Sequence, residues 1–107
     1  MKERCWIVYK DRIVAIRNIS GEESEFLMDP EEIYSYVDGI TGIVHTHDRS
    51  CVPSPLDLEG MKNWRVPWII VSRECIKSYM WSDLGVTEVK IHASLLKELH
   101  DLLMHPF

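Results

Sequence analysis

Cysteine is scarce in this chain, and the three cysteines that are present lie far apart. Cys5, Cys51 and Cys75 are an odd number at wide spacing, which fits neither a disulfide framework nor a CxxC zinc ribbon. We therefore expect reduced thiols. Cys5 and Cys75, each beside a β-like run, are expected to be small buried hydrophobes. Cys51 lies close to two histidines and an aspartate and is a candidate for an additional metal ligand.

Three further absences narrow the class of protein. The net charge is −5 and the basic residues are scattered, so the chain lacks the electrostatic footprint of a nucleic-acid-binding protein. The longest apolar runs, such as residues 68–71, are far too short to span a bilayer, and no signal peptide opens the chain. We expect a cytoplasmic protein. No Pro/Gly/Ser-rich stretch suggests a linker, so residues 1–107 are expected to form one domain.

The residues that are present predict strands mixed with helices. β-branched and aromatic residues predict a hairpin of strands 5–9 and 12–19 around Lys10-Asp11. Strands are also predicted at 42–47, 67–72, 76–81 and 86–91. Asp29-Pro30 and Ser54-Pro55 each resemble a helix cap followed by proline, which predicts helices ending near residues 37 and 64. Leucines at helical spacing predict a final helix. Together these elements predict an α+β fold, a mixed β-sheet flanked by helices.

The segment from His45 to Asp57 carries the clearest chemical signal. His45 and His47 alternate on a predicted strand, so their side chains share a face. Asp57 lies in the first turn of the next helix and can fold back toward them. Two histidines and one carboxylate with an open fourth position are typical of hydrolytic zinc. Two alternatives stay open: the histidines are surface residues of an alternating strand, and Ser54-x-x-Asp57 is only a capping box.

The order and spacing of these residues resemble the JAMM/MPN+ metallopeptidase family. That family has a Glu followed much later by H-x-H, about seven residues, and S-x-x-D, and His45-Thr46-His47, Ser54 and Asp57 match. Glu3-Arg4-Cys5 is similar to the E-x-C that opens the first strand in bacterial and phage members. Phage tail-assembly members have similar residues at the positions of Asn18, Phe26, Asp29-Pro30 and residues 67–72, and the resemblance covers roughly residues 3 to 91.

The resemblance implies an MPN/JAB-like fold and a role for each matched residue. It makes His45, His47 and Asp57 ligands of Zn²⁺, Ser54 the support of the oxyanion and Glu3 the general base. The implied reaction is hydrolysis of a peptide or isopeptide bond in a protein or peptide substrate. The family's substrates include the tails of ubiquitin-like or sulfur-carrier proteins, and its members include phage tail-assembly proteins.

The sequence departs from the family pattern at two places near the motif. Six residues, rather than seven, separate His47 from Ser54, and Asp48 stands where a Pro usually follows the second His. Trp6 replaces the Gly that usually follows E-x-C, and a large side chain there is expected to narrow or block the substrate groove.

A third departure concerns the order of elements. The family has a strand and a helix before the catalytic Glu, and residues 89–103 resemble that missing opening. We hypothesise a circular permutation, in which the last helix ends near Met1. On this interpretation His92, His100 and His105 are scaffold or surface residues.

Two other functional interpretations compete with a zinc peptidase. The first is a non-catalytic MPN-type interaction module, which the short loop and Trp6 favour. The joint retention of Glu3, both histidines, Ser54 and Asp57 argues against it. The second is a zinc hydrolase of another class, such as a deaminase, but no P-C-x-x-C motif accompanies the histidine.

Overall fold

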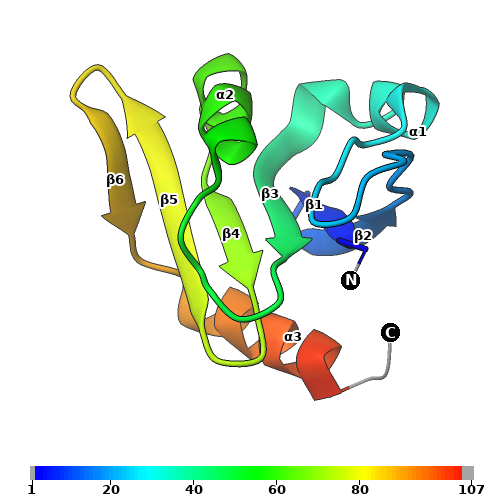
Figure 1. Cartoon of the computed structure of the whole chain (residues 1–107). Helices are drawn as coiled ribbons and strands as arrows, with labels where there is room; N and C mark the ends of the chain where they lie inside the picture. The colour runs from blue at the N-terminus through cyan, green and yellow to red at the C-terminus, as the bar shows by residue number, and fades with distance from the viewer. Residues whose placement is uncertain (1, 105–107) are drawn as a thin grey trace.

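The computed structural model describes residues 2–104, with side chains described up to residue 102. Six strands form one sheet in the order β2-β1-β3-β4-β5-β6 (Figure 1). The strands are β1 (Cys5–Tyr9), β2 (Arg12–Ile16), β3 (Ile40–Thr46), β4 (Trp68–Val71), β5 (Ile76–Ser82) and β6 (Gly85–Val89). Only the β3–β4 pair is parallel. The predicted α+β fold with a mixed sheet is confirmed.

Helices cover both faces of the sheet. They are α1 (Pro30–Tyr34), α2 (Pro55–Asn63) and α3 (Ala93–Met104), with a 3-10 turn at Val37–Gly39. On one face, Met61 of α2 packs with Ile7, Ile43 and Trp68. On the other, Leu99 of α3 is fully buried in a core with Trp6 and Val44. The two apolar cores therefore lie on opposite sides of one sheet, one beneath α2 and one against α3; Figure 1 shows where these two helices lie.

Alternation along β1 decides which core each side chain enters. Cys5 and Ile7 belong to the core beneath α2, whereas Trp6 and Val8 belong to the core against α3. This follows from the two-residue period of a strand. The expectation that Trp6 narrows a groove beside Glu3 and the histidines is wrong, because its side chain is buried on the opposite face of the sheet.

Two boundaries differ from those expected. The second strand ends at Ile16 rather than residue 19, because Asn18 leaves the β1 ladder and forms an isolated bridge with Met28. The helix capped by Asp29 ends at Tyr34, and a separate 3-10 turn follows it.

The position of α3 bears on the hypothesis of circular permutation. Leu95, Leu99 and Leu102 pack against the core that contains Trp6 and Val8 of β1, so the last helix lies against the first strand. Met1 and residues 105–107 lie outside the described residues, and so do His105 and the predicted approach of the helix end to Met1. The permutation stays a prediction. No helix among residues 2–104 has the length and apolarity needed to cross a membrane.

The expectation of reduced thiols is wrong for two of the three cysteines. Cys51 and Cys75 form a disulfide, which also removes Cys51 as an additional metal ligand, whereas Cys5 is a buried free thiol, as predicted. The pairing follows from the topology. Cys51 lies in the loop after β3 and Cys75 in the turn after β4, and parallel neighbouring strands end at the same edge of a sheet.

The disulfide is expected to stabilise the purified oxidised protein substantially. A cross-link spanning 24 positions restricts the unfolded chain by a loop entropy equivalent to about 3 kcal/mol. The double variant Cys51→Ser/Cys75→Ser should therefore unfold at lower urea concentration by about that free energy. Adding a reductant should destabilise the wild type and leave the double variant unchanged. A wild type insensitive to reductant would show that the disulfide does not stabilise the fold.

Candidate metal centre

Strand register brings Glu3 to the two histidines. In the antiparallel β1–β3 pair, Cys5 lies opposite His45, so continuing the register by two residues sets Glu3 opposite His47. Hydrogen bonds continue past the strand end, since Arg4 N–H donates to the side-chain Oγ1 of Thr46 at 2.9 Å and Thr46 N–H donates to the Arg4 carbonyl at 3.0 Å. Residues 42 positions apart in sequence are thereby fixed side by side.

The start of α2 brings the second carboxylate to the same point. Ser54 caps the helix, with Asp57 N–H donating to Ser54 Oγ at 3.1 Å and Ser54 N–H donating to Asp57 Oδ2 at 2.9 Å. Asp57 Oδ1 also lies 3.1 Å from His45 Nε2, and Oδ2 lies 3.1 Å from His47 Nε2. The capping box and the approach to the histidines are therefore not alternatives, because Asp57 makes both sets of contacts.

The donor atoms have the spacing of ligands around one zinc ion. The two Nε2 atoms are 3.1 Å apart, and each lies 3.1 Å from an oxygen of Asp57. Tetrahedral zinc with bonds of 2.0–2.1 Å separates its ligand atoms by about 3.3 Å. Two imidazole nitrogens and a carboxylate directed at one point, largely out of solvent, fit the donor set that zinc requires. The six-residue loop between His47 and Ser54 is long enough for this convergence.

His45 has the environment of a neutral imidazole. Its side chain is fully buried, and its Nδ1 is the one buried side-chain N or O without a hydrogen-bond partner among the described residues. Burial lowers the pKa of His45, and Asp57 opposes that effect only in part. The neutral form is the one that coordinates a metal.

Glu3 is buried beside this centre. Its Oε2 lies 3.7 Å from His47 Nε2, and Glu3, His45 and His47 each offer a ligand atom within 4.8 Å of the others. The distance suits a carboxylate that holds a water next to the metal, and it also suits a direct ligand. The zinc content of Glu3→Gln separates these roles, because only the loss of a direct ligand would also release the metal.

The two carboxylates differ in proton affinity. Burial raises the pKa of Glu3 to about 7, with Asp57 and Glu25 raising it further and His47 opposing them. Burial also acts to raise the pKa of Asp57, but hydrogen bonds from both histidines outweigh it and hold that pKa below its usual range. A hydrogen bond with Asp57 raises the pKa of His47. The pKa of Asp57 thus lies below its usual range, whereas the pKa of Glu3 lies near neutrality.

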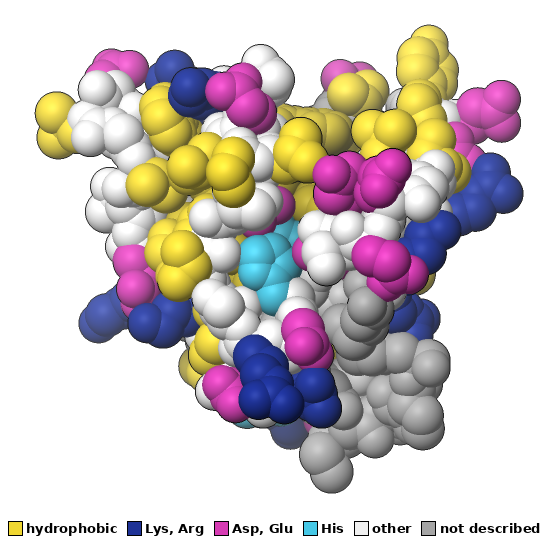
Figure 2. All heavy atoms as spheres, viewed as in Figure 1, with side chains coloured by type: hydrophobic (Ala, Val, Ile, Leu, Met, Phe, Trp, Pro, Cys, Tyr) yellow, Lys and Arg dark blue, Asp and Glu magenta, His cyan; other side chains and the backbone are white. Residues whose placement is uncertain are grey.

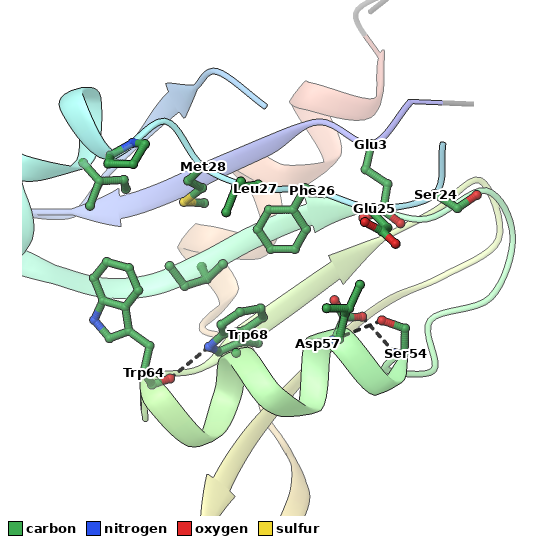
Figure 3. Close-up of a pocket in the computed structure, with 15 residues that line it drawn as sticks. Glu3, Ser24, Glu25, Phe26, Leu27, Met28, Ser54, Asp57, Trp64 and Trp68 are labelled. Atoms are coloured by element: carbon green, nitrogen blue, oxygen red, sulfur yellow. Dashed lines mark hydrogen bonds between the residues drawn. The ribbon is translucent and has the colours of Figure 1, made fainter. Parts of the chain in front are cut away.

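A cavity of about 360 Å³ opens beside the carboxylates and continues between α2 and residues 24–28 (Figure 3). Glu3, Ser54 and Asp57 line one end. Gly60 allows α2 to approach its floor, since a Cβ there would lie 2.3 Å from the Trp68 ring. Apolar side chains line most of the remainder, including Phe26, Leu27, Met28, Leu56, Trp64 and Trp68.

Phe26 and Trp68 complete the surroundings of the centre, and the sequence motif does not include them. The Phe26 ring stacks on His45 with centroids 4.4 Å apart, and Trp68 meets His45 edge-on at 6.1 Å. Trp68 Nε1–H donates to the Trp64 carbonyl at 3.0 Å.

The predicted role of His92 and His100 as surface residues is consistent with their exposed side chains. His92 lies just before α3 and His100 lies on it.

Comparisons with known proteins agree with the fold and give one informative relative. No protein-family model matches the chain. The chain is 39% identical over 87 residues to a desampylase of Pyrococcus furiosus, an alignment that covers 71% of this chain and 61% of the desampylase. The chain therefore spans about three fifths of the length of that relative.

The fold also has a solved counterpart. The solution structure of protein DSY2949 from Desulfitobacterium hafniense superposes with a TM-score of 0.71 at 22% identity, covering 85% of this chain and 77% of that one. At this identity the likeness concerns the fold alone. The six-stranded mixed sheet with three helices is consistent with an MPN-like fold.

Proposed function

We propose that this chain is a JAMM/MPN+-type zinc isopeptidase that cleaves a ubiquitin-like modifier from its target. The observation that carries the proposal is the convergence of His45, His47 and Asp57 at mutual distances of 3.1 Å, with Glu3 beside them. The relation to a desampylase supports the class of substrate. Nothing in that relation supports the phage tail-assembly role implied by the sequence resemblance.

Each residue has a role that its surroundings support. His45, His47 and Asp57 would hold the ion. Zinc bound there would lower the pKa of a water to about 7 and polarise the substrate carbonyl. Glu3, with a pKa near neutrality, would take the proton from the attacking water and pass it to the leaving nitrogen.

Ser54 is placed to support the developing oxyanion. Its oxygen accepts a hydrogen bond from Asp57 N–H, which leaves the hydroxyl proton free to be donated. It also lines the same end of the cavity as Glu3 and Asp57. Such a donor stabilises negative charge on the attacked carbonyl oxygen.

The cavity beside the centre supports an extended substrate segment with apolar side chains. Leu27 and Leu56, each more than half exposed at 57% and 58%, line its two sides. Hydrophobic and acidic side chains gather around a histidine on this face (Figure 2). Glu25 lies in the cavity wall. A modifier tail that combines apolar and basic residues would complement this surface.

Shortening the leucines of the groove should weaken substrate binding without affecting the metal. In Leu27→Ser and Leu56→Ser, each loss of apolar contact should lower kcat/KM for a modifier–lysine isopeptide by about tenfold, mainly through KM. Leu84→Ser is the matched control, because Leu84 is 97% exposed in the β5–β6 turn. Unchanged kcat/KM in both groove variants would mean that the substrate does not use this cavity.

Cleavage itself is tested with a ubiquitin-like modifier joined through its C-terminal carboxyl to the ε-amine of a fluorescent lysine peptide. Zinc-loaded protein should release the peptide, chelation should stop the release, and added zinc should restore it. Retained zinc with no cleavage of any modifier tested would favour the non-catalytic interaction module. The burial of Trp6 away from the site removes one of the two features that favoured that module.

A further inference from the structure

Asn18 lies just past β2, and its side chain makes four hydrogen bonds. Nδ2 donates to the carbonyls of Glu3 at 2.7 Å and Glu25 at 3.0 Å. Oδ1 accepts from the backbone N–H groups of Ser20 at 2.9 Å and Leu27 at 3.0 Å. Because a primary amide has two N–H donors and two acceptor lone pairs, its hydrogen-bonding capacity is fully used.

The first contact fixes the backbone of Glu3. The β1–β2 ladder pairs Cys5 with Ile16, so its continuation sets Asn18 opposite Glu3. The backbone of Asn18 instead bridges to Met28, and the side-chain amide takes over the contact with the Glu3 carbonyl. On the other side Arg4 is bound to Thr46 of β3. The segment that carries Glu3 is therefore held from both sides.

The other contacts fix the wall of the groove. Asn18 binds the carbonyl of Glu25 and the N–H group of Leu27. These two residues stand directly before and after Phe26 in the sequence. Holding both neighbours sets the position of the Phe26 ring, which stacks on His45. One side chain thus connects the general base, the groove wall and the ring packed on a metal ligand.

We propose that Asn18 is a positioning residue of the metal centre. Its amide keeps the Glu3 carboxylate beside His47 and keeps Phe26 against His45. This inference rests on the proposed peptidase function. Asn18 is not among the residues that line the cavity, and its effect on the reaction comes through Glu3 and Phe26.

The variant Asn18→Asp tests the role with little change in shape. An aspartate offers no N–H donor and places a negative charge against two carbonyl oxygens. We expect zinc content equal to that of the wild type and kcat lower by about 10²-fold, the effect of a small misplacement of a catalytic group. Wild-type kcat in this variant would overturn the proposal. Asn18→Ser, which keeps one donor, replaces it if the aspartate variant is too unstable to purify.

Arg17→Gln is the matched control for stability. Arg17 is next to Asn18 in sequence, but its side chain pairs with Asp29 and Glu32 rather than with Glu3 or residues 24–28. It should lower the unfolding midpoint and leave kcat unchanged. An equal loss of kcat in Arg17→Gln would show that general destabilisation, rather than positioning, explains the effect at Asn18.

A double-mutant cycle separates positioning from a purely structural role. If Asn18 acts through Glu3, adding Asn18→Asp to Glu3→Gln should reduce the residual single-turnover rate far less than it reduces the wild-type rate. Equal fold-reductions in both backgrounds would overturn the proposal.

Failure of the proposed function would be distinguishable from failure of this inference. If the zinc-loaded wild type cleaves no modifier, the function fails, and crystal structures of the zinc-loaded wild type and Asn18→Asp then decide the inference. A Glu3 carboxylate displaced from His47 in the variant supports positioning by Asn18. A Glu3 carboxylate in the same place in both overturns it.

Discussion

Replacing Glu3 by glutamine should abolish most turnover and leave zinc in place. Glutamine keeps the size and polarity of the side chain but cannot accept the proton of the attacking water. General-base catalysis contributes about 10²–10⁴-fold to a rate, so kcat should fall by that factor. Elemental analysis should still find the wild-type amount of zinc, because the donors at 3.1 Å spacing are His45, His47 and Asp57.

The control for this experiment is Glu22→Gln, which removes a carboxylate from an exposed loop position and should keep wild-type kcat and zinc. Loss of zinc from Glu3→Gln would mean that Glu3 is a ligand, as its 3.7 Å approach to His47 allows. Retention of both zinc and turnover would remove Glu3 from the mechanism.

Replacing Asp57 by alanine should release the metal. Asp57 places Oδ1 3.1 Å from His45 Nε2 and Oδ2 3.1 Å from His47 Nε2, and its low pKa keeps it ionised. Without it, two imidazoles remain, one fewer than the three protein ligands typical of catalytic zinc. Dialysed Asp57→Ala should contain little zinc and show no metal-dependent cleavage.

Ser54→Ala separates the ligand role of Asp57 from its role in the helix cap. It breaks the same capping box, at a cost of about 1 kcal/mol of stability, but removes no ligand. It should keep zinc and lose turnover through the missing oxyanion donor. Asp57→Ala with full zinc content would mean that Asp57 only caps α2 and that Glu3 completes the ligand set.

Local sequence rules located most of the elements and predicted the residues of the candidate centre. Asp29-Pro30 and Ser54-Pro55 were sufficient to place the starts of α1 and α2, because caps act within one helical turn. The alternation of His45 and His47 placed both on the face of the sheet that meets α2. Side chains alternate between the two faces of a strand, so the same rule applied to β1 predicts that Glu3 and Trp6, three residues apart, project to opposite faces.

What the sequence could not supply depends on contacts between distant segments. The Cys51–Cys75 disulfide follows from the parallel pairing of β3 with β4, which no local pattern shows. The short second strand follows from the bridge of Asn18 to Met28. Phe26 reaches His45 only because the segment after β2 folds back over the centre.

Zinc per chain, measured by elemental analysis on protein purified without a histidine tag, tests the central claim most directly. The wild type should carry close to one zinc per chain, and the His45→Ala/His47→Ala variant should carry almost none. Absence of zinc from the wild type, even after metal is supplied, would contradict the account. It would mean that the two histidines are only residues of a strand face and that Asp57 only caps α2.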